Sequence, residues 1–199
     1  MRIQSCALTL LLVLLSAQAL AFTGPKPGDV VKVTLDQVHP TQAVIGFDQV
    51  YYKLERFAKD RQNLFDEICE SNGQDEAKTV GEGADPLKPE SFNCKDEPNA
   101  HPEEMKTVVV GPGGQLYLTD GHHTFSTLWE QPGVGAQMKM NVRITDDFSD
   151  SADMATFWKR MEKAHKVWLK DGNGQALSPD QLPVHVGLKS MQNDILRSI

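Results

Sequence analysis

The chain has 199 residues, of which 40% are hydrophobic, and its 20 Lys and Arg against 27 Asp and Glu give a formal net charge of −7. This length fits a single domain with its own core. The chain has no basic run, which argues against high-affinity, sequence-independent DNA binding, because such binding depends on phosphate neutralisation by lysine and arginine.

Residues 1–21 predict a secretory signal peptide. Arg2 supplies the positive flank, residues 6–15 form an apolar run, and Ala17-Gln18-Ala19 and Ala19-Leu20-Ala21 are small-x-small cleavage signals. The apolar run is short for a bilayer span, so an uncleaved membrane anchor is disfavoured. We therefore expect a secreted or periplasmic protein that has no membrane association once the signal is removed.

The first part of the mature region, residues 22–199, predicts a strand followed by helices. Alternating apolar residues indicate a strand over 29–35, and a turn follows over 36–42. Apolar residues at helical spacing run from Phe47 to Ile68, with a break between two helices expected near Asp60.

The two cysteines of the mature region predict a disulfide. Cys69 and Cys94 are the only thiols left after the signal is removed, and two cysteines in an oxidising compartment most simply form one bridge. This bridge would tie the end of a helix to an irregular excursion over 71–104, a segment of a length that is usually functional or tethered. The alternative is a metal site with His101, which the absence of a CxxC pair disfavours.

The second half of the chain predicts two strands, 107–110 and 115–118, joined by a glycine turn and followed by a short helix from Thr124. Alternation over 137–144 indicates a half-buried strand. A last short helix is expected over 191–197.

A further helix is predicted after residue 149. Ser149 and Ser151 are its candidate N-caps. Its apolar face would hold, or lie near, these residues: Met154, Phe157, Trp158, Met161, His165 and Trp168.

The segment Thr119-Asp120-Gly121-His122-His123-Thr124 lies between the second of these strands and the short helix. Backbone N–H groups are unpaired at a helix start, and an acid, a glycine and two imidazoles there suit an anion or a metal-bound water. The two imidazoles are neighbours and cannot point the same way. We expect one to enter a cleft while the other packs or hydrogen-bonds Asp120.

This order of elements resembles the second sequence box of the ParB/sulfiredoxin superfamily, and it is closest to the ParB-like nuclease branch with its D-G-H-H signature. The resemblance covers most of the chain after the signal. Val33-Thr34-Leu35, followed by Pro40-Thr41-Gln42 and Gly46, resembles the first box of the superfamily. The segment 193–198 is similar to the terminal segment of the same branch.

The resemblance implies an α+β fold, in which helices surround a small mixed β-sheet, and a phosphate- or nucleotide-handling cleft at the helix start. In ParB and sulfiredoxin relatives the second box ends in an arginine that contacts phosphate. Thr124 stands there in this chain, with one hydroxyl and no charge. This departure argues against nucleoside triphosphate binding of the ParB kind. Sulfiredoxin chemistry needs a cysteine where His122 stands.

The function expected from these residues is that of an exported nuclease or phosphodiester hydrolase. A neutral imidazole of His122 or His123 would act as general base, and Asp120 would orient it. The N–H groups of the glycine turn and of the helix start would stabilise the developing phosphate charge. Candidates for binding the phosphate or a cofactor are Gly121, Thr124 and His39, the last because the two boxes adjoin in the superfamily fold.

Cofactors and partners follow only in outline. A divalent metal held by Asp120 and a histidine is compatible with the sequence, but no ligand set has diagnostic spacing. The expected partner is a phosphate-containing small molecule or a nucleic acid. The alternative function is a non-catalytic phosphate-binding, nucleotide-binding or interaction protein on a degenerate ParB-like fold, which the missing arginine and the acidic balance favour.

Overall fold

The structure is a computed structural model that describes residues 24–198. The predicted signal peptide over 1–21 lies outside the described residues. Within 24–198 no helix is long and apolar enough to cross a membrane.

Five strands form one mixed sheet in the order β1-β6-β4-β5-β2. β1 pairs antiparallel with β6, and β4 antiparallel with β5, whereas β4–β6 and β2–β5 are parallel pairs. A second, two-stranded sheet joins β3 to β7. The predicted α+β fold with a small mixed sheet is therefore confirmed. The strand bounds are β1 (Val30–Thr34), β2 (Val38–Pro40), β3 (Val44–Ile45), β4 (Thr107–Val110), β5 (Leu116–Leu118), β6 (Lys139–Asp147) and β7 (Gln192–Asn193).

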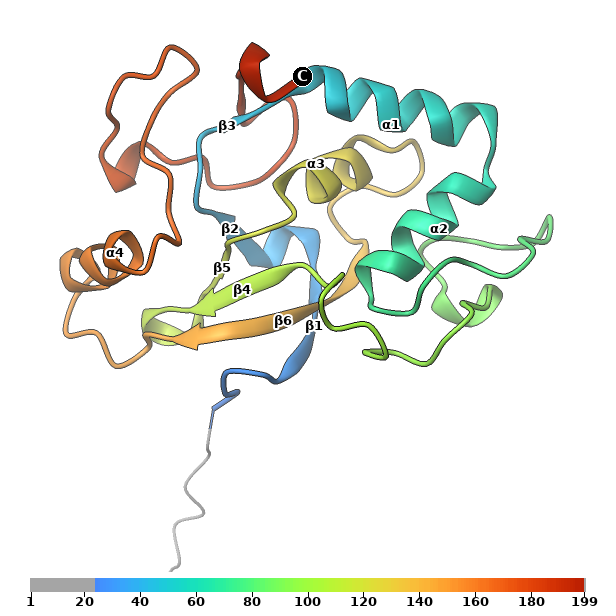
Figure 1. The fold of residues 1–199 in the computed structure, drawn as a ribbon, viewed down its shortest axis with the longest axis horizontal. Coiled ribbons are helices and arrows are strands. Elements are labelled where there is room, and N and C mark those ends of the chain that lie inside the picture. The colour runs from blue at the N-terminus through green and yellow to red at the C-terminus, as the bar shows by residue number, and fades with distance from the viewer. Residues whose placement is uncertain (1–23, 199) are drawn as a thin grey trace, which may run out of the picture.

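The helices pack on both faces of the five-stranded sheet. Side chains alternate between faces along a strand, and β4 shows this directly. Val108 and Val110 join the main core, whereas Val109 joins a smaller cluster with Phe157 and Met161. In Figure 1, α1, α2 and α3 lie on one side of the sheet, and α4 lies apart from them. The helix bounds are α1 (Phe47–Lys59), α2 (Gln62–Ser71), α3 (His122–Glu130) and α4 (Met154–Lys163).

The predicted break between the first two helices lies at Asp60. This residue is extended, with φ −144° and ψ 111°, and its carboxylate accepts the N–H of Gln62 at the start of α2. The break lets α2 pack against α1, and both helices lie on the same side of the sheet (Figure 1).

The helix predicted after residue 149 begins later and ends earlier than expected. Its N-cap is Asp153, whose carboxylate accepts the N–H of Thr156 at 2.7 Å, and neither Ser149 nor Ser151 takes this role. α4 ends at Lys163. Beyond it His165 has φ +55°, so His165 and Trp168 do not continue the helical face.

The last predicted helix, 191–197, is replaced by two short elements. β7 pairs with β3, and the 3-10 helix η5 (Ile195–Ser198) follows it. Pairing with a distant strand supplies the backbone hydrogen bonds that a local helix would otherwise provide, which is why local spacing gave the wrong element.

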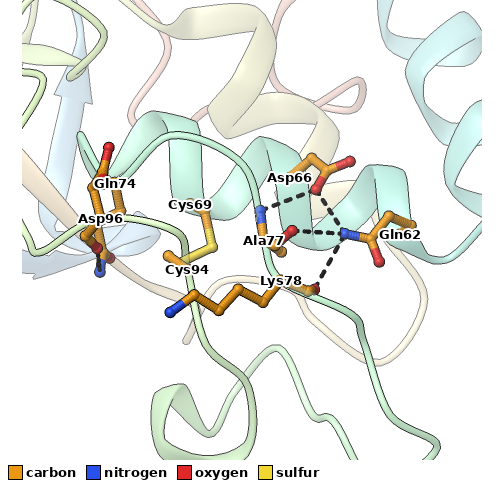
Figure 2. The surroundings of a disulfide bond; sticks show 8 residues. All are labelled: Gln62, Asp66, Cys69, Gln74, Ala77, Lys78, Cys94 and Asp96. Atoms are coloured by element: carbon orange, nitrogen blue, oxygen red, sulfur yellow. Dashed lines mark hydrogen bonds between the residues drawn. A yellow bond between two sulfur atoms is a disulfide. The ribbon is translucent and has the colours of Figure 1, made fainter.

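The irregular excursion 71–104 is tied to α2. Cys69 and Cys94 form the predicted disulfide. Beside it, the carboxylate of Asp66 accepts the N–H of Ala77 at 3.0 Å (Figure 2). The disulfide takes up both thiols, so the alternative Cys/His metal site is not formed.

The excursion also contributes to the core. Phe92 packs edge-on against Phe65 of α2 with ring centroids 4.8 Å apart, and Ala77 and Ala84 are buried. The imidazole of His101, the residue considered as a metal ligand, contacts Asp96 instead, at 2.6 Å. The excursion is therefore a packed part of the domain.

Candidate functional site

The start of α3 is an uncovered helix N-terminus. Gly121 is the N-cap residue with φ +98°, a backbone conformation that favours glycine. The first intrahelical bond runs from the N–H of Phe125 to the carbonyl of Gly121. The N–H groups of His122, His123 and Thr124 have no hydrogen-bond acceptor among residues 24–198, as is usual in a first helical turn. This end of α3 therefore offers donors to an anion.

Both imidazoles bind backbone from the β2–α1 region. Nε2 of His122 accepts the N–H of Thr41 at 3.2 Å, and Nε2 of His123 accepts the N–H of Gly46 at 2.9 Å. Thr41 is held in place because its hydroxyl donates to the carbonyl of Leu118 at 2.7 Å. The segments that resemble the first and second boxes are therefore joined through their side chains and backbone.

These hydrogen bonds fix the tautomers. A backbone N–H can only donate, so each Nε2 must carry a lone pair, and the proton of each neutral ring is on Nδ1. Burial above all, and then the charges of the neighbouring His123 and Arg197, lower the pKa of His122 to about 3. Burial and the charges of Lys53 and Arg197 lower the pKa of His123, and Asp120 acts in the opposite direction. Both rings are thus neutral near pH 7, and each has one N–H left to donate.

A small cavity opens at this helix start. Its volume is about 240 Å³, and it brings two cationic side chains, Lys106 and Arg197, next to both histidines. The residues that line it are Gln42, Lys106, Thr119, Asp120, Gly121, His122, His123, Thr124 and Arg197.

Gly121 is required for the position of Lys106 as well as for its own backbone. A Cβ at residue 121 would lie 2.6 Å from Cγ of Lys106 and 2.8 Å from its Cδ. The stem of the lysine side chain therefore runs across Gly121, and its ammonium donates to the carbonyl of Glu104 at 3.2 Å. Any side chain at residue 121 would therefore force the stem of Lys106 to move.

The C-terminal segment carries Arg197 to the cavity. The N–H of Asp194 donates to the carbonyl of Ile45, and the side chain of Asn193 accepts the N–H of Phe47 at 2.9 Å. The guanidinium of Arg197 then lies 3.4 Å from the carboxylate of Asp194. The segment that resembles the family's terminal box is thus bonded to the first box and completes the cavity wall.

Asp120 lies on the exposed side of the cavity. Among the described residues its carboxylate makes no hydrogen bond to either imidazole, and each Nε2 is bonded to a backbone N–H instead. The expected arrangement, in which Asp120 orients a histidine base, is not the one that this structure has.

Thr124 takes part in a polar cluster behind the cavity. Its hydroxyl donates to the carboxylate of Glu67 at 2.7 Å, and the ammonium of Lys53 contacts the same carboxylate at 2.6 Å. The three residues come from α3, α2 and α1. They hold the three helices together at the point where α3 begins, and the hydroxyl of Thr124 is engaged there.

His39, the remaining candidate, lies away from this cavity. Its Nε2 is 2.8 Å from the side-chain oxygen of Gln115, and its ring contacts Tyr117. It lines a larger cavity of about 630 Å³ between the β2–β5 edge of the sheet and α4. The structure therefore does not bring His39 together with Asp120, His122 and His123.

No metal-ligand set is evident in the part of the chain that the structure describes, since no three His, Cys, Asp or Glu side chains cluster closely enough to hold an ion. Asp120 with one histidine would supply at most two ligands.

Sequence reasoning missed Lys106 and Arg197. Lys106 immediately precedes a predicted strand, and nothing local distinguishes it from a surface lysine. Arg197 lies within the segment that resembles the family's terminal box. Because Thr124 stands where relatives have a phosphate-binding arginine, an arginine in another box was the signal that could have identified Arg197.

Comparison with known proteins agrees with this architecture. The fold is similar to that of protein Atu1540 from Agrobacterium tumefaciens, at 17% sequence identity and a TM-score of 0.55. The similarity covers 85% of this chain but 64% of Atu1540, less than two thirds of its length, and at this identity it concerns the fold alone. No curated protein matches the chain.

Residues 31–199 match the model of a family described as "Putative ParB-like nuclease", so the chain belongs to this family. The matched range contains all three boxes and every residue that lines the cavity at the start of α3.

Proposed function

We propose that this protein is an exported phosphodiester hydrolase that binds the phosphate of its substrate in the cavity at the start of α3. The observation that carries the proposal is that Lys106 and Arg197 line the same cavity as the start of α3, where three backbone N–H groups have no acceptor among residues 24–198. Cations and aligned backbone amides are the groups that bind phosphate in proteins. The family described above supports a nuclease of this general kind.

The histidines act as neutral donors in this proposal. Because Nε2 of each ring accepts a backbone N–H, the Nδ1–H of His122 or His123 is the group that can donate to a phosphate oxygen. Fixed donors of this kind stabilise the charge that develops in the transition state. The pKa of His122, about 3, keeps its donor role unchanged over the whole physiological range.

The proton acceptor assigned here is Asp120, whose carboxylate lies on the exposed side of the cavity. The oxygen of a water molecule bonds to phosphorus, and one ester P–O bond breaks. The proton of the water goes to the carboxylate, and the leaving oxygen takes a proton from solvent. This role replaces the histidine base that the sequence suggested.

Export is part of the proposal. The predicted signal over residues 1–21 motivates it, and the Cys69–Cys94 disulfide supports it, since disulfides persist in oxidising compartments. Mass spectrometry of the protein recovered outside the cytoplasm should give a first residue at or near Phe22. An intact Met1 on that protein would contradict export with signal cleavage.

Turnover of bis(p-nitrophenyl) phosphate by the purified protein tests the activity, with Mg²⁺ or Mn²⁺ added and withheld. Asp120→Asn should lower kcat at least about 100-fold, the contribution typical of general acid–base catalysis, and should leave the affinity for inorganic phosphate within about threefold. Asp146→Asn, at a carboxylate outside the cavity lining, is the matched control. Equal kcat for Asp120→Asn and the unmodified protein would remove Asp120 from the mechanism.

The second candidate is a non-catalytic phosphate-binding protein. One observation favours it: neither imidazole has a lone pair free to accept a proton. Binding of inorganic phosphate that is lost in Lys106→Met, without turnover of any phosphodiester under either metal condition, would establish this second function. Absence of both binding and turnover would reject both functions.

A further inference from the structure

A large aromatic side chain is exposed directly beside the cavity. Trp168 is 44% exposed. It lies in the segment that follows α4 and runs beside residues 41 and 42. The backbone N–H of Trp168 donates to the carbonyl of Thr41 at 2.8 Å, and Trp168 forms a parallel β-bridge with Gln42. Thr41 is the residue that binds His122, and Gln42 lines the cavity. The backbone under this indole is therefore bonded to the backbone that forms the site.

Arg197 connects the indole to the cavity. Its guanidinium carbon lies 5.4 Å from the centre of the Trp168 ring, within the distance at which a cation is attracted to an aromatic face. The same guanidinium lines the cavity, and one of its nitrogens lies 3.4 Å from the side-chain oxygen of Gln42. One side chain thus lies over the aromatic ring and also lines the cavity in which the phosphate is proposed to bind.

A second cation lies over the same ring. Nζ of Lys170 is 5.2 Å from the ring centre, and Lys170 is exposed. Its flexible stem allows the ammonium to move aside when another group stacks on the indole, and to contact a neighbouring phosphate.

An exposed tryptophan by itself is often a surface residue without a binding role. Three observations separate Trp168 from that case: its backbone is fixed to the cavity wall, a cavity cation contacts its ring, and a second cation is close by. An aromatic face between phosphate-binding groups is the arrangement that binds single-stranded nucleic acid, because every base has a face that can stack.

We propose that Trp168 stacks on a base of a single-stranded nucleic acid whose adjacent phosphate occupies the cavity at the start of α3. The inference rests on the proposed phosphate site and names its substrate class. A base inside a duplex is already stacked on both faces and is not available to the indole. The net charge of −7 and the absence of a basic run weigh against the many phosphate contacts with which duplex-binding proteins attach.

The test uses three fluorescently labelled probes of equal length: a single-stranded (dT)8, an abasic eight-phosphate strand, and an eight-base-pair duplex. The purified protein should bind (dT)8 about tenfold more tightly than the abasic strand and the duplex, since one stacked base contributes on this order. In Trp168→Ala the preference for (dT)8 over the abasic strand should disappear, and in Trp168→Phe most of it should remain.

Trp158→Phe is the matched control, because Trp158 lines the larger cavity on the other side of the sheet edge. This variant should keep the full preference. Circular dichroism of each variant verifies folding. We expect the Trp168 variants to fold, because this side chain is 44% exposed. The inference is overturned if Trp168→Ala binds (dT)8 as tightly as the unmodified protein, if the abasic strand or the duplex binds equally well, or if no probe binds.

The outcome is separable from that of the proposed hydrolase. Base-dependent binding without turnover of bis(p-nitrophenyl) phosphate would support the role of Trp168 and reject catalysis. Turnover with no preference for bases would support catalysis and reject the role of Trp168.

Discussion

The two cavities at the end of the β2–β5 strand pair differ in size and in the side chains that line them. The smaller one has the hydrogen-bond donors and cations that could bind a phosphate. The larger, about 630 Å³, is lined mainly by apolar and aromatic side chains, including the exposed Met154 and Val184, with three charged residues among them. The smaller, about 240 Å³, has cations, unpaired amides and two neutral imidazoles. The largest apolar pocket is the usual first choice for a binding site. Here the convergence of donors is the better guide, because recognition of phosphate depends on fixed donors and charge.

The largest expected effect is on the pH dependence of the free energy of unfolding, and it comes from the buried His122 of the smaller cavity. The folded-state pKa of His122, about 3, lies below the unfolded value near 6.5. Between these values only the unfolded chain takes up a proton at this residue, so its contribution to stability is complete above about pH 6.5 and falls as the pH is lowered towards 3. The loss is about 1.4 kcal/mol per pH unit, or roughly 3 kcal/mol at pH 4.5.

Urea unfolding from pH 7 to pH 4.5 measures this effect as the difference between the unmodified protein and His122→Gln. The glutamine does not titrate, and its side-chain oxygen can accept the N–H of Thr41. The variant should therefore lose less stability on acidification by about the stated amount, while the effects of the carboxylates cancel in the difference. Parallel pH profiles for the two proteins would contradict a buried, neutral His122.

A smaller effect is expected from Gly121→Ala. The positive φ costs about 1–2 kcal/mol of stability for an alanine, and the new methyl group forces the stem of Lys106, which lines the cavity, to move. Calorimetry with inorganic phosphate should find binding weakened about tenfold, the equivalent of about 1.4 kcal/mol.

Gly133→Ala is the matched control for this change. Gly133 has φ +80°, and a methyl group there would meet open space. It should lose a similar amount of stability, about 1–2 kcal/mol, and keep the original affinity for phosphate. Equal affinities in the two alanine variants would show that displacement of Lys106 has no effect on binding.

The smallest effect is expected at the larger cavity. His39→Ala removes a ring that contacts Tyr117 and Gln115 but does not line the smaller cavity. Calorimetry should find less than about a twofold change in phosphate affinity, because screened charges and distant contacts contribute little. A tenfold loss would place His39 in the phosphate site and would break the distinction between the two cavities.

Sequence reasoning located elements whose signals are local. The break at Asp60, the strands on either side of the glycine turn and the start of α3 all follow from spacing and turn residues within short windows. The disulfide followed from composition, since residues 22–199 contain two cysteines. The resemblance to ParB-like proteins predicted the mixed sheet. The spacing of apolar residues predicted individual strands but not the order in which they pair.

Other features depend on contacts between distant residues. Asp153 caps α4, whereas the hydroxyl of Ser151, one of the two predicted caps, donates to the carbonyl of Phe148. The contact between Arg197 and Gln42 spans 155 residues, and no local pattern encodes it. The hydrogen-bond roles of the two histidines were also hidden, since they depend on which backbone N–H groups reach each ring.

The N–H groups of Thr41 and Gly46 are bonded to imidazole nitrogens. Their exchange with deuterium should therefore be slow as long as both rings stay in place, although neither N–H belongs to a helix or to a sheet ladder. These two amides report on the integrity of the site in a protein without substrate, and their rates should rise together if α3 separates from the segment that precedes α1.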